Sequence, residues 1–233
     1  MPRTYIKLAA AVVASGLAVA ACSTMKLGSA AIVGNQRITT AQLSTEVSNY
    51  NAAYQRYHGT IQQQFDASQT AQQVLGWLVS FQVTDRMAQR YGITITPTQQ
   101  NKALNEVMSE VSQQQPGATT GELAAAIGLA PDMVSGFARF EAIQNAVASR
   151  LDGGTAPASG SAAATALQSK FTASQCRAAA SLGIQVNPQF GAFDYTLNDY
   201  GAYSVVPATP TLSKEASSSS SPAASGGQLS PHC

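Results

Sequence analysis

The fold is decided near the N-terminus, in the stretch Ala30-Ala31-Ile32-Val33-Gly34-Asn35-Gln36-Arg37-Ile38-Thr39-Thr40-Ala41-Gln42-Leu43. Two short apolar strands flank Gly34-Asn35, the residue types that a tight hairpin turn with positive φ requires. Thr39 then supplies a helix N-cap, and Gln42 follows it at the spacing of a capping box. The stretch therefore predicts a β-hairpin that leads directly into a helix.

Helical patterns fill most of the chain after this hairpin. Apolar residues recur at steps of three and four, and each run ends at glycine or proline. The third run opens at Thr96-Pro97, with the cap and the proline that start a helix. The pattern predicts a mainly α fold of about six helices, over residues 40–57, 68–91, 97–115, 119–127, 129–151 and 162–181.

Three sets of residues resemble the SurA N-terminal domain family of bacterial exported chaperones, which includes PrsA-type lipoproteins. The first is the opening hairpin, and the second is the run of breaks between helices at Tyr91-Gly92-Ile93, Thr96-Pro97 and Ile127-Gly128-Leu129. The third is Val186-Asn187-Pro188-Gln189-Phe190-Gly191, near the end of the folded part. The resemblance implies a small antiparallel sheet, in which the strand Ile184–Val186 pairs with the hairpin. A lone hairpin is marginally stable in water, so a third strand is physically reasonable.

The chain departs from the family at the linker of residues 152–161. SurA- and PrsA-like proteins carry a parvulin prolyl-isomerase domain at about this point, but here the linker offers no room for one. The parvulin core also uses paired histidines, whereas the two histidines of this chain, His58 and His232, lie outside that region. The sequence therefore predicts a protein that is not an enzyme.

The first residues have the form of a lipoprotein signal peptide. Arg3 and Lys7 precede an apolar segment, which ends in Val19-Ala20-Ala21-Cys22, the pattern of a lipobox. We expect lipidation at Cys22 and a location on the outer face of the bacterial cell membrane; an ordinary secretory signal is the alternative. The predicted organisation is a signal peptide (1–21), a tether (22–29), a helical domain (30–207) and a disordered Ser/Pro-rich tail (208–233).

Composition and motifs exclude several kinds of site. A net charge of +1 and 11% charged residues, with no Lys/Arg run, argue against nucleic acid as a partner. The chain has no metal-ligand spacing, phosphate loop or nucleophile motif, so we expect no metal and no small-molecule cofactor. Cys176 and Cys233 could form a disulfide in an exported protein, or could remain a buried helical thiol and a free terminal one.

The function that the resemblance implies is chaperoning without catalysis. A lipid-anchored holdase would bind unfolded exported polypeptides in a groove between helices, through apolar and aromatic side chains that adapt to many partners. Core packing is the competing interpretation for each candidate residue, and a structural or interaction lipoprotein with one specific envelope partner is the alternative function. The candidate client-binding residues are Tyr50, Tyr54, Trp77 and Met108.

Overall fold

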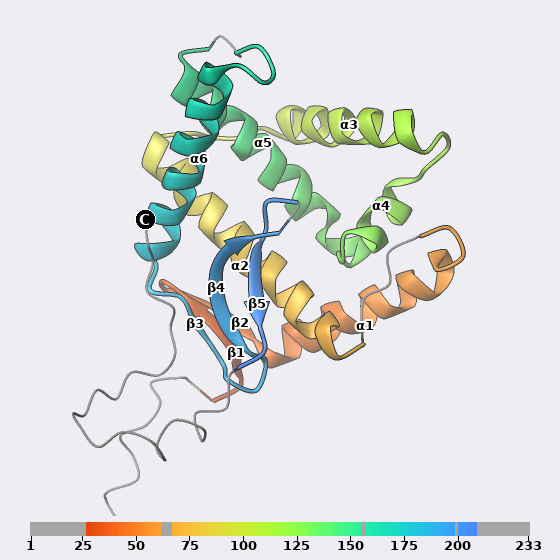
Figure 1. Cartoon of the computed structure of the whole chain (residues 1–233). Helices are drawn as coiled ribbons and strands as arrows, with labels where there is room; N and C mark the ends of the chain where they lie inside the picture. The colour runs from red at the N-terminus through yellow and green to blue at the C-terminus, as the bar shows by residue number, and fades with distance from the viewer. Residues whose placement is uncertain (1–26, 62–66, 155–156, 199, 209–233) are drawn as a thin grey trace, which may run out of the picture.

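The computed structural model describes residues 27–208, apart from 62–66, 155–156 and 199 (Figure 1). The predicted signal peptide, the lipidation site Cys22 and residues 209–233 of the predicted tail lie outside the described residues, so these remain predictions. The predicted domain boundaries also remain predictions, although the first strand already begins at Ser29, the last residue of the predicted tether.

The described part of the chain is mainly helical, as the sequence predicts. Six α-helices and one short 3₁₀ turn follow the opening hairpin, and their starts and ends lie within a few residues of the predicted ones. The linker predicted at 152–161 corresponds to the segment between the last two helices. The elements are α1 (Thr40–Tyr57), α2 (Ala67–Tyr91), α3 (Pro97–Gln114), α4 (Thr120–Ala126), η1 (Pro131–Met133), α5 (Val134–Asp152) and α6 (Ala162–Ala180).

Helix starts are fixed by local side-chain caps. The Thr39 hydroxyl accepts a hydrogen bond from the backbone N–H of Gln42 at 3.0 Å. Thr96 and Thr119 each form a complete capping box, in which Gln99 and Glu122 accept from the backbone N–H of the cap residue. Caps of this kind satisfy N–H groups that have no partner inside the helix, which is why their sequence signature locates helix starts well.

The two ends of the domain meet in one small sheet. Strands β1 (Ser29–Val33), β2 (Gln36–Thr39) and β3 (Gln185–Val186) are antiparallel in the order β2-β1-β3. The turn glycine, Gly34, has a φ of 60°, as the hairpin prediction requires. Asn187 extends the β3 contact, since its backbone N–H donates to Ala30 O at 2.8 Å and its side chain donates to Ser29 O at 3.0 Å. This confirms the predicted pairing of the late strand with the hairpin.

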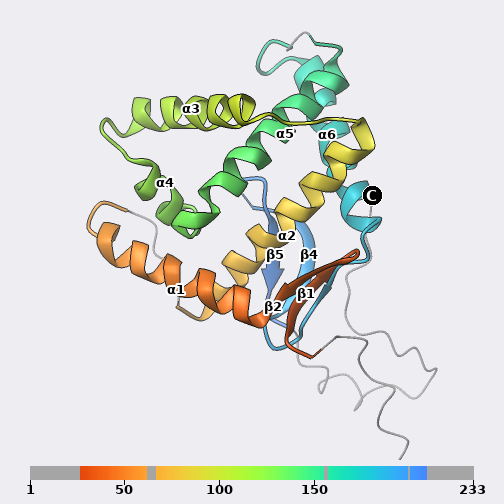
Figure 2. The same cartoon turned by 180° about the vertical axis from the view of Figure 1, so that it is seen from behind.

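The segment after β3 adds two strands that we did not predict from the sequence. Strands β4 (Ala192–Leu197) and β5 (Tyr203–Val206) form a second antiparallel hairpin. This hairpin lies against one face of α2 (Figures 1 and 2). The β-pattern is hard to read from the sequence because the strands are short and the turn between them is long.

The core is built around α2. Trp77 is fully buried, and its ring meets Phe137 and Phe140 of α5 edge-on, with ring centroids 5.6 Å away in each case. Its indole N–H donates to Ile127 O at 2.9 Å, which ties the end of α4 to α2. Edge-on aromatic pairs and a satisfied indole stabilise this packing. Helix α2 therefore lies at the centre of the described packing, in contact with α1, α5, α6 and β5.

Candidate functional site

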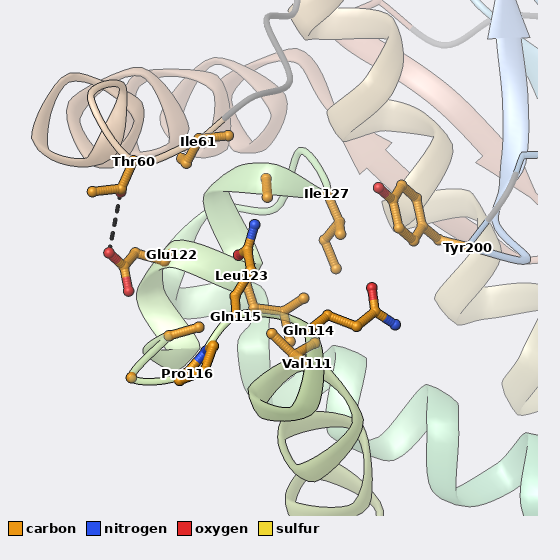
Figure 3. Close-up of a pocket in the computed structure, with 13 residues that line it drawn as sticks. Thr60, Ile61, Val111, Gln114, Gln115, Pro116, Glu122, Leu123, Ile127 and Tyr200 are labelled. Carbon is orange, nitrogen blue, oxygen red and sulfur yellow. Dashed lines mark hydrogen bonds between the residues drawn. The ribbon is translucent and has the colours of Figure 1, made fainter.

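A cleft of about 610 Å³ opens on the side of the domain where α1, α3 and α4 lie together (Figure 3). Its volume is within the range of protein sites that bind ligands. Apolar side chains from four different segments line it, together with amides and one carboxylate. The lining residues are Thr60, Ile61, Val111, Gln114, Gln115, Pro116, Gly117, Ala118, Glu122, Leu123, Ala126, Ile127 and Tyr200.

Helix breaks in the sequence create the walls of this cleft. Helix α3 ends at Gln114, and Pro116-Gly117 turns the chain so that α4 begins at an angle to it. Proline cannot continue a helix, and Gly117, with a φ of 87°, takes a conformation that few other residues adopt. Val111 near the end of α3 and Leu123 on α4 both line the cleft, and both side chains are half-buried.

The end of α1 is joined to α4 at the rim of the cleft. The Thr60 hydroxyl donates to Glu122 Oε1 at 3.1 Å, as the dashed line in Figure 3 shows. Hydrogen bonds from the backbone and side chain of Thr119, and then that from Thr60, lower the pKa of the Glu122 carboxyl. Glu122 therefore holds a stable negative charge at this rim.

Tyr200 forms the opposite side of the cleft. It lies in the β4–β5 turn, where Asn198 Oδ1 accepts from the backbone N–H groups of both Tyr200 and Ala202 at 3.0 Å. Among the described residues, Tyr200 and Leu27 are the two large apolar side chains that remain exposed, at 38% and 99%. The ring is thus held near the apolar floor of the cleft, beyond Ile127 (Figure 3), while a large part of it stays accessible.

The four client-binding candidates from the sequence do not meet at one site. Trp77 is 0% and Tyr50 2% exposed, so both lie in the core, whereas Tyr54 and Met108 are partly exposed on α1 and α3. The rings of Tyr50 and Tyr54 lie 6.1 Å apart. None of the four is among the residues that line the cleft. Tyr50 and Trp77 are therefore core-packing residues, as the competing interpretation holds.

Tyr200 and the α3–α4 break are the site features that sequence reasoning missed. A signal for them was present: Asn198 and Gly201 flank Tyr200 with turn-forming residues between two apolar runs. The Pro116-Gly117 break was visible too, but only as the end of a helix. Nothing in the sequence shows that these two turns meet in space.

Two pairs of carboxyl groups lie where neighbouring elements pack against each other. Burial, then a hydrogen bond to and the charge of Asp132, raise the pKa of Glu46 to about 7, at the contact between α1 and η1. Burial, then the charge of Glu110 on α3, raise the pKa of Glu141 on α5 to about 7. Asn49 also donates to Asp132 Oδ2 at 3.1 Å. Each pair is easiest to accommodate with one proton bound.

A second hollow has a different chemistry. It measures about 530 Å³ and lies between the β1–β2 turn, α2 and α5. Polar and charged groups line it, among them Asp85 and Arg139, whose side chains form an ion pair at 2.8 Å. An apolar segment bound here would remove these charged groups from water without offering them hydrogen bonds, which costs free energy. This hollow is therefore a poor match for an apolar segment.

Other features bear on the expected sites. Cys176 is disulfide-bonded, which removes the interpretation of this residue as a free buried thiol. No group of three or more metal-ligating side chains lies in the part of the chain that the structure describes. In that same part, no single helix is long and apolar enough to cross a membrane, and α4 with η1–α5 meets the criterion only as a pair bent by 105°.

Comparison with known proteins identifies the family. No curated protein and no solved structure matches the chain. A family model described as the SurA-like N-terminal domain matches residues 6–123, just over half of the chain. The match includes the opening hairpin, α1 to α3 and the start of α4, and so most of the cleft lining except Ala126, Ile127 and Tyr200. The chain therefore belongs to the family of SurA-like N-terminal domains.

Proposed function

We propose that this protein is a lipid-anchored holdase that binds extended segments of unfolded exported polypeptides in the cleft. Membership of the SurA-like N-terminal family supports a chaperone-like role. The single observation that carries the proposal is the cleft itself, with a floor of Ile127, Leu123 and Val111 and an accessible Tyr200 beside it.

The lining of the cleft is suited to partners of varied sequence. Its apolar contacts gain free energy from burial without requiring a fixed hydrogen-bond geometry. The side-chain amides of Gln114 and Gln115 are exposed, so they are free to donate to or accept from the backbone of an extended segment. Such contacts bind weakly and reversibly, as a holdase must in order to release its clients for folding.

The proposed anchor agrees with the position of the cleft. The described chain begins at Leu27, at the sheet, whereas α3 and α4 lie at the other end of the domain (Figures 1 and 2). The residues between Cys22 and Ser29 span at most roughly 25 Å when extended. A lipid on Cys22 would therefore keep the sheet close to the membrane and leave the cleft open to polypeptides emerging at its outer face.

The test is a titration of a labelled, permanently unfolded polypeptide with the purified chain, followed by fluorescence anisotropy. We expect saturable micromolar binding that disappears when the client is able to fold. Tyr200→Ala should weaken it about three- to tenfold, since it removes roughly 1 kcal/mol of aromatic contact. Leu27→Ala is the matched control, because it removes an exposed apolar side chain outside the cleft.

Two results would contradict the proposal. Absence of binding at tens of micromolar would remove general chaperoning and favour a lipoprotein with one specific envelope partner. Equal weakening by Tyr200→Ala and Leu27→Ala would mean that clients bind, but at another surface.

A further inference from the structure

We infer that the cleft selects client segments that carry lysine or arginine beside their apolar residues and discriminates against acidic ones. This inference rests on the proposed function and adds to it the class of segment that is bound. It follows from the one charged side chain among the described residues that line the cleft, the carboxylate of Glu122.

Glu122 is the one charged side chain among the described residues that line the cleft. No lysine, arginine or histidine is among them. The carboxylate is held at the rim by donors on its protein side, the Thr119 N–H at 2.7 Å, the Thr119 hydroxyl at 2.9 Å and the Thr60 hydroxyl at 3.1 Å. These contacts fix the position of the charge, and none of them supplies a neutralising cation.

The neighbouring helices add negative charge. Glu110 lies one turn before Gln114 on α3, and residues four apart on a helix share a face, so it flanks the cleft wall. Glu141 on α5 interacts electrostatically with Glu110, and since burial and this charge raise the pKa of Glu141 to about 7, the pair adds close to one negative charge and not two. The nearest cation on α3, Lys102, is paired with Glu106 at 3.6 Å, and neither of these residues lines the cleft.

The geometry separates the charged and the apolar parts of the site. Figure 3 shows Glu122 at the Thr60 rim and Tyr200 on the opposite side, with Ile127 between them. An extended segment crossing the cleft would place apolar side chains over Ile127 and Tyr200 and one end beside Glu122. A cation at that end gains an exposed ion pair, whereas a carboxylate meets repulsion from Glu122 and, further along, from Glu110.

The test compares three labelled peptides that share the central segment Leu-Val-Tyr-Leu and carry two lysines, two glutamines or two glutamates at each end. We expect the lysine peptide to bind the purified chain about fivefold more tightly than the glutamate peptide, with the glutamine peptide between them, since ion pairs with exposed carboxylates are weak. The difference should shrink at about 1 M salt, where the Debye length is ~3 Å.

Two variants test whether the preference for the lysine peptide arises from Glu122 at the rim of the cleft. Glu122→Gln should reduce the ratio between the lysine and glutamate peptides to about twofold or less. The start of α4 should be retained in this variant, because glutamine also serves in a capping box. Glu106→Gln removes the same charge from the exposed face of α3 and should leave the ratio unchanged.

The outcomes distinguish the inference from the proposed function. If the three peptides bind equally well, the cleft still binds clients, but the inference of charge selection is wrong. If the glutamate peptide binds best, or if Glu106→Gln changes the ratio as much as Glu122→Gln, the inference is also wrong. If none of the peptides binds, the proposed function fails and the inference fails with it.

Discussion

The two ends of the β4–β5 hairpin differ in packing: strand β5 is packed tightly against α2, whereas the turn between the strands is partly exposed at the cleft. Where it rests on α2, the contact is backbone against backbone: a Cβ built on Gly76 would lie 2.5 Å from Tyr203 O. Ser80 Oγ accepts from the Tyr203 N–H at 2.7 Å and donates to Gly76 O at 2.7 Å. Three residues earlier, at the cleft, Tyr200 is 38% exposed.

We call the contact of Gly76 and Ser80 on α2 with Tyr203 on β5 the seat of the hairpin. The difference shows how a rigid contact can hold a neighbouring side chain in an accessible position. The seat leaves no space, and Ser80 pairs with the buried N–H of Tyr203 and the carbonyl of Gly76, so the contact fixes the strands of the hairpin. Because the strands are fixed, the turn between them is fixed too, and Tyr200 stays at the cleft although its side chain is not buried. Changes in the seat should therefore act on stability, whereas changes in the cleft should act on binding.

The largest effect is expected from closing the space at the seat. Gly76→Ala should lower the free energy of unfolding by about 2–3 kcal/mol, because the added methyl meets a backbone carbonyl that is unable to turn away. Denaturant unfolding measures this change. Gly59→Ala is the control, since a Cβ there meets nothing within 4 Å. Equal stability of the two variants would show that α2 and β5 are not in rigid contact.

Removing the polar link in the seat should have a smaller effect. Ser80→Ala leaves the buried N–H of Tyr203 without its acceptor and should cost about 2 kcal/mol. Ser112→Ala, which removes a hydroxyl bonded to Met108 O on the exposed side of α3, should cost much less. Similar losses in both variants would mean that water replaces Ser80 at the seat.

The carboxyl pair between α3 and α5 predicts a dependence on pH. The pKa of Glu141 is about 7 in the folded protein, whereas the ordinary value for a glutamate, as in the unfolded chain, is 4.5. The folded state therefore binds this proton more tightly than the unfolded state does. Stability should therefore fall as pH rises from about 4.5 to about 7 and level off above that range. Glu141→Gln should stabilise the protein by about 1 kcal/mol at pH ~8 and have little effect at pH ~4.

Chemical unfolding at the two pH values measures this prediction. Glu106→Gln, on the exposed face of α3, is the control for loss of a carboxylate. A stabilisation by Glu141→Gln that is the same at both pH values would assign the effect to packing and not to ionisation.

The smallest effect on stability is expected in the cleft. Tyr200→Ala should change the free energy of unfolding by less than about 0.5 kcal/mol, as is usual for exposed positions, although it weakens client binding. Thermal unfolding and the anisotropy titration, performed on the same preparation, compare the two properties. A large loss of stability would show that Tyr200 is part of the seat, and the division between the two regions would then be wrong.

Local signals in the sequence determined the elements of this protein. Threonine caps, glycine stops and apolar periodicity located the six helices because each signal acts within a few residues. The return of β3 to the first hairpin was predictable from the family motif at Val186-Asn187-Pro188, which fixes a long-range pairing that periodicity alone does not give.

Only the tertiary structure decided the site. The cleft is formed by the end of α1, the α3–α4 break and the β4–β5 turn. These segments are far apart in the sequence, since 140 positions separate Thr60 from Tyr200. Tyr50 and Trp77, two of the four candidate client-binding residues, lie in the core, where burial of their large rings gains free energy. A sequence shows which side chains are apolar, but their burial depends on which helices pack over them, and this is set by contacts between distant residues.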